Sequence, residues 1–185
     1  MRKGHHHDPL LKLCPDYSDR IIAFTSPSKS FNLAGMQVSN IIIPNPEYQN
    51  LWRHQTVDRF AISSDNPMGF TAMIAAYNHC EYWLDTVNSY IDDNIRFAEE
   101  YLAKHLPKAH MSPCQGTYLI WVDLRAYCNN ADDLKSLMLY RAKVLLDEGY
   151  IFGPEGIGYE RINTACPRKV LSDCLDRMVQ ALKYL

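Results

Sequence analysis

The 185-residue sequence has no long apolar run, no block of basic residues and no signal-peptide pattern. No stretch approaches the roughly 20 consecutive apolar residues that a membrane-spanning helix needs, and no apolar segment follows the basic N-terminus. The formal net charge of −2 comes without the basic surface that nucleic-acid binding requires. We therefore predict a cytoplasmic protein that binds neither membranes nor nucleic acid.

The cysteines and histidines lack the spacing of a metal site. None of the six cysteines lies in a Cys-x-x-Cys pair, and no histidine stands at a matching distance. We therefore expect no metal, and we interpret the cysteines as reduced thiols of an intracellular protein. The run His5–His7 has two other interpretations, an expression tag or a metal site, but it is short for a tag and no second ligand cluster accompanies it. We expect an exposed polar loop.

Apolar residues make up 47% of the chain and charged residues 22%, which is typical of a globular protein with a sizeable core. Residues 1–66 are predicted to be the end of an α/β sheet domain. Arg20–Thr25 is an apolar run flanked by turn residues, which predicts a buried parallel strand, and Gln37–Ile43 is a second strand candidate. Two strands cannot bury both faces of a sheet, so we expect this part to need further structure in front of it.

Residues 67–105 are predicted to be a long helical bridge. Asn66 and Pro67 are typical of a helix start, as the N-cap and the first helical residue. Apolar residues then recur at helical spacing until Pro107. This is longer than an ordinary globular helix, so we expect a break near residues 79–82 or a helix that spans two domains.

Residues 106–185 are predicted to form a small α+β domain. In chain order we expect a strand over residues 117–124, a helix over 131–148 with Gly149 as its C-cap, a short strand over 160–165 and a last helix after Pro167. A glycine-rich loop lies between them, over residues 150–159. It is not G-x-G-x-x-G and opens no clear helix, so we give phosphate binding there little weight.

Lys29 follows an apolar run and the polar turn Thr25–Ser28. Burial lowers the pKa of a lysine and can make it a nucleophile; from residue types alone, a surface lysine just past a strand end remains the alternative. Ser26–Lys29 also matches S-x-x-K and Ser64–Asn66 matches S-D-N, two marks of penicillin-binding serine enzymes. The third mark, Lys-Thr-Gly, is absent and the residues after Lys29 look loop-like, so we disfavour this interpretation.

The segment Ser26–Gly35 resembles the lysine segment of fold-type-I pyridoxal-phosphate enzymes of the aminotransferase class I/II family. The resemblance is greatest to the MalY/PatB branch, the cystathionine β-lyase type of C–S lyase. It continues in order through residues 3–9, 39–45, 75–77, 81–84, 116–121 and 153–168. The fold that it implies is α/β: the C-terminal part of an aminotransferase-like large domain, with a mixed, mostly parallel sheet, plus a small α+β C-terminal domain. The N-terminal half of the family has no counterpart in the sequence.

The resemblance implies a role for four residues. Lys29 would bind the aldehyde of pyridoxal 5'-phosphate covalently and, once released, would remove the substrate Cα proton. Ser26, and more weakly Ser28, would bind the cofactor phosphate, whereas a turn-stabilising hydroxyl is the alternative for Ser26. Arg161 would bind the substrate α-carboxylate in a two-pronged fork, unless it pairs with Glu160 or a helix-end acid. Gln37 stands where many aminotransferases carry a phosphate-binding arginine, which favours the C–S lyase branch.

The reaction that the resemblance implies is α,β-elimination of a cysteine S-conjugate, such as cystathionine, to a thiol, pyruvate and ammonia. Transamination is the alternative within the fold, and a catalytically silent fragment or structural subunit is the alternative outside enzymology. We expect a small amino-acid substrate, a homodimer or a complementing N-terminal half as partner, and structural roles for Arg168 and Asn163.

Overall fold

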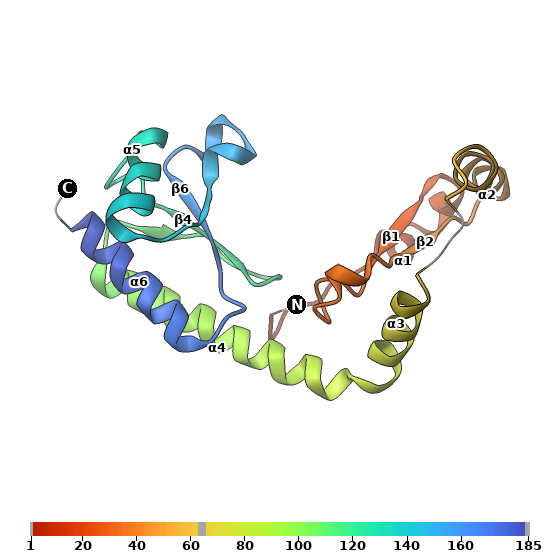
Figure 1. Cartoon of the computed structure of the whole chain (residues 1–185), viewed down its shortest axis with the longest axis horizontal. Helices are drawn as coiled ribbons and strands as arrows, with labels where there is room; N and C mark the ends of the chain where they lie inside the picture. Colours follow the sequence, from red (N-terminus) through yellow and green to blue (C-terminus); the bar gives the residue numbers. More distant parts are fainter. Residues whose placement is uncertain (1, 63–65, 184–185) are drawn as a thin grey trace. The chain divides into compact units, whose positions relative to one another are not determined.

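The computed structural model describes residues 2–62 and 66–183, which form two compact units (Figure 1). One unit is His7–Thr86, and the other, here called the C-terminal unit, combines residues 2–6 with residues 87–183. The division falls inside the long helix α4, Glu81–His105. The three-part division at residues 66 and 105 stays a prediction.

The unit His7–Thr86 contains two short strands and several short helices. Its elements are α1 Leu10–Leu13, η1 Pro15–Arg20, β1 Ala23–Thr25, η2 Ala34–Met36, β2 Asn40–Ile42, α2 Pro46–Arg53, the π-helix η3 His54–Arg59, α3 Pro67–His79 and the beginning of α4. α3 approaches η2 closely, because a Cβ on Gly69 would lie 3.0 Å from the carbonyl oxygen of Met36.

The prediction of a buried parallel strand over residues 20–25 is wrong in two respects. β1 contains only three residues, and it pairs with β2 in antiparallel register, with Phe24 opposite Ile41. Both of these side chains are exposed, at 60% and 38%. Arg20 ends the preceding helix η1, and Ile21 and Ile22 lie outside both the helix and the strand. All strand pairings among the described residues are antiparallel.

The helical stretch over residues 67–105 breaks at Cys80, as predicted. α3 ends at His79 and α4 begins at Glu81, and Cys80 between them has φ −114° and ψ 22°. The helix start is also confirmed, because the Asn66 side chain accepts a hydrogen bond from the Met68 backbone N–H, 3.1 Å long. This capping bond satisfies one of the backbone donors that the first turn leaves unpaired.

The C-terminal unit contains a four-stranded antiparallel sheet. After α4, the elements of this unit are β3 His110–Met111, β4 Leu119–Asp123, α5 Ala131–Ser136, the π-helix η4 Leu137–Ala142, β5 Asp147–Glu148, η5 Gly149–Phe152, η6 Pro154–Gly156, β6 Tyr159–Asn163 and α6 Arg168–Leu182. The strands run in the order β3-β4-β6-β5. The strand predicted over residues 160–165 is thus β6, shifted toward the N-terminus.

Helices α4 and α6 run along one side of the sheet (Figure 1), and the core of this unit includes side chains from both helices and from the sheet. Ile120 and Val122 of β4 and Ile162 of β6 are almost completely buried, and they pack in one cluster with Ile95 of α4 and Leu175 of α6. Side chains alternate along a strand, so the residues between them face away from this core. The outward-facing residues are Leu119, Trp121 and Asp123 of β4 and Tyr159, Arg161 and Asn163 of β6, each at least partly exposed.

The helix predicted over residues 131–148 ends earlier than expected. α5 continues into η4 and stops at Ala142, because Lys143 adopts a left-handed conformation with φ 54°. The Arg177 side chain of α6 donates a 2.8 Å hydrogen bond to the Lys143 carbonyl, which satisfies an acceptor at the helix end. The prediction of Gly149 as a C-cap is therefore wrong.

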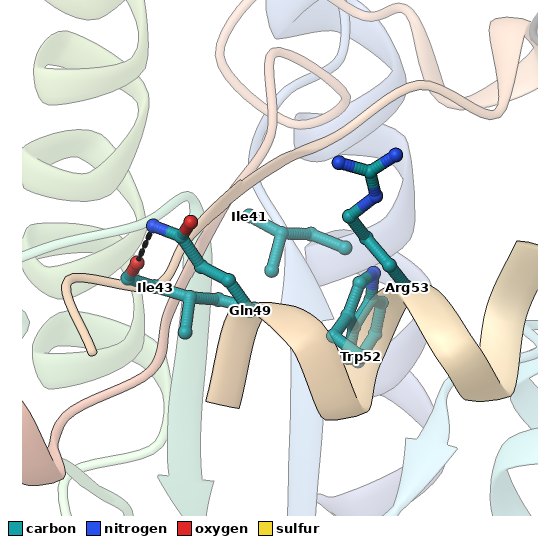
Figure 2. Close-up of a pocket in the computed structure, with 5 residues that line it drawn as sticks. All are labelled: Ile41, Ile43, Gln49, Trp52 and Arg53. Atoms are coloured by element: carbon teal, nitrogen blue, oxygen red, sulfur yellow. Dashed lines mark hydrogen bonds between the residues drawn. The ribbon is translucent and has the colours of Figure 1, made fainter. Parts of the chain in front are cut away.

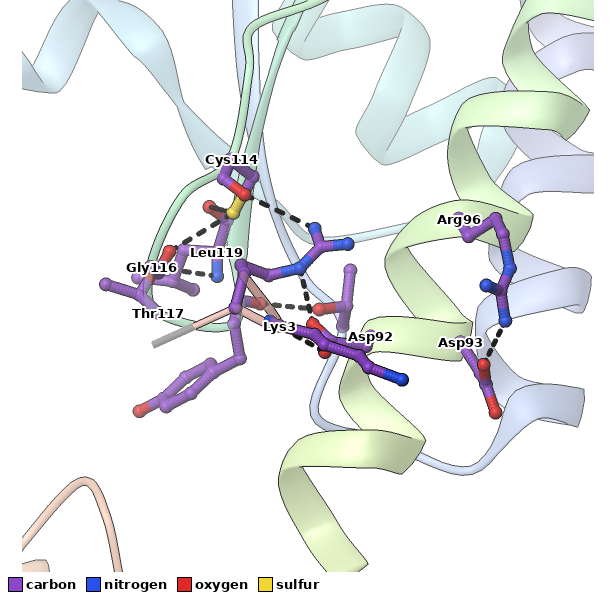
Figure 3. A network of polar contacts seen from close by, with 11 residues as sticks. Lys3, Asp92, Asp93, Arg96, Cys114, Gly116, Thr117 and Leu119 are labelled. Atoms are coloured by element: carbon purple, nitrogen blue, oxygen red, sulfur yellow. Dashed lines mark hydrogen bonds and ion pairs between the residues drawn. The ribbon is translucent and has the colours of Figure 1, made fainter. Parts of the chain in front are cut away.

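Within the C-terminal unit, Arg2 and Lys3 are bound to α4 and to the segment between β3 and β4 (Figure 3). Arg2 forms an ion pair with Asp92 of α4, and the Lys3 backbone N–H donates to the same carboxylate at 3.2 Å. Arg2 also donates to the Cys114 carbonyl at 3.4 Å. His5–His7 are exposed and lie outside helices and strands, which confirms the expected loop.

The six cysteines are free thiols, and each is partly buried. Among residues 2–62 and 66–183 there is no group of three or more His, Cys, Asp or Glu side chains that could hold a metal ion. No helix in the same ranges is long and apolar enough to cross a membrane.

Candidate functional site

Lys29 lies in a tight turn directly after β1. The Phe31 backbone N–H donates to the Pro27 carbonyl at 2.9 Å, and the Leu33 N–H donates to the Ser28 carbonyl at 3.0 Å. These bonds fold the backbone around Lys29, whose side chain is exposed. The burial that a nucleophilic lysine needs is thus not supplied within the described unit.

The hydroxyls of Ser26 and Ser28 meet in front of Lys29. Their Oγ atoms are 2.6 Å apart, and the Ser28 backbone N–H donates to Ser26 Oγ at 3.1 Å. Ser26 Oγ also donates to the Val38 carbonyl at 2.9 Å. Since each hydroxyl has one proton, the proton of Ser26 is used for Val38 and Ser28 supplies the proton between the two serines. The turn-stabilising role that the sequence left open for Ser26 is therefore present in this geometry.

These residues fit a phosphate group chemically. Hydroxyl groups rotate to suit an acceptor, and the two serine oxygens lie next to each other within three residues of a lysine. Gln37 follows η2 in a left-handed conformation, with φ 51° and an exposed side chain. It could add a neutral amide donor, so the only charged donor of this turn is the Lys29 ammonium.

Arg161 is held in place by two neighbours. Its Nε and Nη2 donate to the same oxygen of Asp147, Oδ2, at 3.0 and 2.7 Å. The Phe152 ring lies under the guanidinium, 4.5 Å from ring centre to Cζ. The side chain stays 31% exposed, and no hydrogen bond among the described residues uses Nη1. The acidic partner is thus Asp147 on the next strand, not Glu160.

Glu160 points the opposite way and is a residue that the sequence interpretation missed. It is completely buried, and neither carboxylate oxygen has a hydrogen-bond partner among the described residues. Burial, together with the smaller effect of the nearby carboxylates of Glu148 and Asp147, raises the pKa of Glu160 to about 8. The alternation of β6 could have placed Glu160 on the same face as Ile162, which is the signal that the sequence offered.

The predicted residues fall into both units. Lys29, Ser26 and Ser28 lie in the unit His7–Thr86, where the structure brings them together, and Arg161 lies in the C-terminal unit. Ser26 precedes a turn rather than a helix, which removes the structural context of the S-x-x-K interpretation. Ser64 and Asp65 of its second motif lie outside the described residues.

Three cavities among the described residues have linings without Lys29, Ser26 or Ser28, and one of the three borders Arg161. A cavity of 220 Å³ is lined by Ile41, Ile43, Gln49, Trp52 and Arg53, and Gln49 donates a 2.6 Å hydrogen bond to the Ile43 carbonyl (Figure 2). A cavity of 580 Å³ lies beside α5 and η4. A third, of 380 Å³, is bordered by Arg161, Asp147 and the beginning of α6.

Arg168 and Asn163 make local contacts. Arg168 Nε donates to Asn94 Oδ1 at 2.7 Å, and Asn163 Oδ1 accepts from the Ala165 backbone N–H at 2.8 Å. Asn94 is itself buried and donates to the carbonyls of Thr164 and Cys166. These bonds connect α4 to the segment before α6, in line with the structural roles expected for Arg168 and Asn163.

The sequence is similar to known proteins over almost the whole chain. No family model matches the sequence. The chain is 37% identical over 182 residues to cystathionine beta-lyase PatB of Bacillus subtilis, which covers 98% of this chain and 47% of PatB. It is 31% identical over 159 residues to protein MalY of Escherichia coli, covering 86% of this chain and 41% of MalY.

Solved structures also match the fold of this chain over nearly its whole length. A pyridoxal-phosphate-bound putative aminotransferase from Clostridium difficile superposes with a TM-score of 0.93 at 35% identity, over 98% of this chain and 47% of that protein. Cystalysin from Treponema denticola, which contains pyridoxal 5'-phosphate, gives 0.90 at 36% identity, over 100% and 46%. The chain thus spans about half the length of these relatives.

These likenesses confirm the fold class expected from the sequence, the C-terminal part of an aminotransferase-like large domain with a small α+β domain. The MalY/PatB resemblance is confirmed as well, by relatives of both names. By sequence and by fold, the chain matches the C-terminal half of cystathionine beta-lyase PatB and of protein MalY.

Proposed function

We propose that this chain supplies the C-terminal half of a pyridoxal-phosphate-dependent C–S β-lyase. The enzyme would cleave cysteine S-conjugates by α,β-elimination to a thiol, pyruvate and ammonia. The observation that carries the proposal is the pair of serine hydroxyls 2.6 Å apart in the turn of Lys29, in a chain 37% identical to a cystathionine beta-lyase.

Each residue has a task in this proposal. Ser26 and Ser28 would turn their hydroxyls from Val38 and from each other to donate to the cofactor phosphate. Lys29 Nζ would hold the cofactor covalently until the substrate amine takes its place. When bound, the cofactor supplies an electron sink for the charge that develops at the substrate Cα. Lys29 Nζ takes the Cα proton, and the Arg161 guanidinium binds the α-carboxylate and fixes the direction of the Cα–H bond. As the Cβ–S bond breaks, the protonated amine of the released Lys29 would give its proton to the departing sulfur, which leaves as the thiol.

The proposed enzyme needs groups beyond this chain. We infer that a complementing N-terminal half supplies the remaining contacts to the cofactor and that the complete enzyme is a homodimer acting on small amino acids. The exposed apolar side chains of β1 and β2, among them Phe24 and Ile42, support a covering partner, because large exposed apolar patches mark interaction sites.

Transamination is the second candidate. It is favoured by the C. difficile structure, described as a putative aminotransferase and 35% identical to this chain. Gln37 speaks against it, because a neutral amide replaces the charged arginine that the resemblance places there in many aminotransferases. The two candidates differ in their products, since only elimination releases ammonia.

A chimera that joins the N-terminal half of PatB to this chain tests the proposal. Incubated with cofactor and L-cystathionine, it is expected to release pyruvate and ammonia in equal amounts, and Lys29→Ala is expected to abolish this release while Lys12→Ala preserves it. Transfer of the amino group to an added 2-oxo acid without ammonia would establish transamination instead. A folded, cofactor-loaded chimera with neither activity would refute both elimination and transamination. The remaining interpretation would be a catalytically silent fragment or structural subunit.

A further inference from the structure

The outward face of the C-terminal sheet carries a row of three aromatic rings. Trp121 of β4 and Tyr159 of β6 are stacked, with centroids 5.5 Å apart and planes at 19°. Phe152 of η5 meets Trp121 edge-on, with centroids 5.6 Å apart. This row, Phe152–Trp121–Tyr159, lies on the face of the sheet opposite the buried residues Ile120 and Ile162.

Each end of the row carries an arginine paired with an aspartate. At one end Arg161 lies over Phe152 and pairs with Asp147. At the other end Arg125 lies over the Tyr159 ring, 4.8 Å from its centre. Its Nε and Nη2 donate to the two carboxylate oxygens of Asp123 at 3.0–3.2 and 2.7 Å. The surface therefore has a positive and a negative group at both ends of an apolar strip.

The position of Arg125 is built into the backbone. A Cβ on Gly158 would lie 2.4 Å from Arg125 Cγ, so only glycine leaves room for this side chain. Gly158 also has φ +83°, which glycine adopts readily, and its carbonyl accepts a 2.8 Å hydrogen bond from the Leu124 N–H. Hydrogen bonds from Arg125 hold the pKa of Asp123 below its usual range, so this carboxylate remains charged.

We propose that this strip binds a thioether with an amino-acid group at each end, and that Arg125 and Asp123 hold the end remote from the reacting carbon. The guanidinium of Arg125 would bind the distal carboxylate, and Asp123 would accept from the distal ammonium. The proposal rests on the proposed function for the other end, where Arg161 binds the reacting amino acid. It adds a subsite that selects substrates by their leaving group.

The dimensions agree with such a ligand. Asp123 is the register partner of Tyr159, and Trp121 is the register partner of Arg161. The two ends are thus offset by two residues along the strands, or about 6.6 Å at 3.3 Å per residue. The five bonds between the two α-carbons of such a thioether span a similar length, and its sulfur would lie over aromatic rings, a favourable contact.

The same charges disfavour other ligands of an aromatic-basic surface. Asp123 and Asp147 each place a carboxylate beside the guanidinium, and a polyanion such as single-stranded nucleic acid would be repelled there. A zwitterionic end group satisfies both partners, because charge-assisted hydrogen bonds form to each. A small zwitterion is therefore the class that this face fits.

Binding can be measured on the full chain without turnover. In a Trp52→Phe, Trp83→Phe background, the fluorescence of Trp121 reports ligands on the strip. L-Cystathionine is expected to bind about tenfold more tightly than S-methyl-L-cysteine, since the two coupled distal contacts are together expected to add a net of about 1.5 kcal/mol. Arg125→Ala should remove this difference by weakening cystathionine alone, whereas Arg96→Ala, an exposed arginine paired with Asp93, should preserve it.

Asp123→Asn keeps the shape of the side chain and serves as a second variant that does not depend on the folding of Arg125→Ala. It is expected to give a similar loss of the preference for cystathionine. Equal affinity of the two thioethers, or unchanged selectivity in both strip variants, would overturn the proposal. Lys29→Ala should leave this fluorescence titration unchanged, because Lys29 lies in the other unit. Loss of turnover in the chimera with selective binding intact would therefore contradict the proposed function and not the subsite.

Discussion

Arg161 of β6 stands directly opposite Asp147 of β5, and two of its nitrogens donate to the one oxygen Asp147 Oδ2. The aspartate therefore orients the guanidinium without using its whole fork. For the loaded chimera we predict that Arg161→Ala raises KM for L-cystathionine about 10- to 100-fold, as expected for losing a hydrogen bond to a charged group of about 1.5–3 kcal/mol.

Two variants serve as controls for this effect. Arg161→Lys keeps the charge but not the fork, so an intermediate KM is expected. Asp147→Asn keeps an oxygen that accepts from Arg161, and because the pair is half exposed, its KM should stay within about threefold of the parent. An unchanged KM in Arg161→Ala would show that the carboxylate binds elsewhere.

Ser26 has a turn-stabilising role in the structure and a phosphate-binding role in the proposal, and two cofactors separate them. We predict that Ser26→Ala weakens binding of pyridoxal 5'-phosphate about tenfold, since a hydrogen bond to a charged group is lost. Binding of pyridoxal, which lacks the phosphate, should change little. Equal weakening of both, measured by equilibrium dialysis of the chimera, would leave Ser26 as a turn residue only.

Glu160 makes the stability of the C-terminal unit depend on pH. Burial, with help from Glu148 and Asp147, raises its pKa from an ordinary 4.5 to about 8. Between these values the folded state keeps a proton that the unfolded state releases. The free energy of unfolding therefore falls as pH rises from about 4.5 to about 8 and levels off above it.

Replacement of this carboxyl tests the assignment. Glu160→Gln should be more stable than the parent at pH 8.5 by a few kcal/mol, since one pKa unit corresponds to about 1.4 kcal/mol, and close to the parent at pH 5. Glu148→Gln should shift the parent's pH dependence to lower pH by removing a like charge. Urea unfolding followed by Trp121 fluorescence measures both, and a pH-independent difference for Glu160→Gln would contradict the raised pKa.

Gly149 and Gly156 hold the loop that presents Phe152. A Cβ on Gly149 would lie 2.1 Å from the Gly156 carbonyl oxygen, and a Cβ on Gly156 would lie 2.0 Å from that of Gly149. Either alanine variant forces two backbones apart, so we predict a loss of about 2–4 kcal/mol in the free energy of unfolding. Gly35→Ala is the control, because no described atom lies within 4 Å of its Cβ position, and a change within about 1 kcal/mol is expected.

Local signals in the sequence predicted the elements that local chemistry decides. Asn66 and Pro67 mark a helix start by capping alone, and the break at Cys80 follows from a helical pattern too long for one helix. The end of η4 could not be found this way. It depends on Arg177, which reaches the Lys143 carbonyl from 34 residues further along the chain.

The candidate site shows the same limit. The resemblance pointed to Lys29 and Ser26, but residue types alone left both a functional and a structural role open. Asp147 as the partner of Arg161 depends on the β5–β6 register, which periodicity does not determine. A glycine in the sequence does not reveal what it faces, and Gly35 has open space around it among the described residues.

The central claim is that Lys29 carries the cofactor, and peptide mapping after borohydride reduction tests it most directly. Trypsin normally cuts after Arg20, Lys29 and Arg53, and a cofactor fixed to Lys29 blocks the middle cut. The cofactor-loaded chimera is therefore predicted to yield a single peptide of residues 21–53 that carries the added mass, and Lys29→Ala is predicted to lose the label. Cofactor mass on another lysine, or equal labelling in Lys29→Ala, would contradict the account.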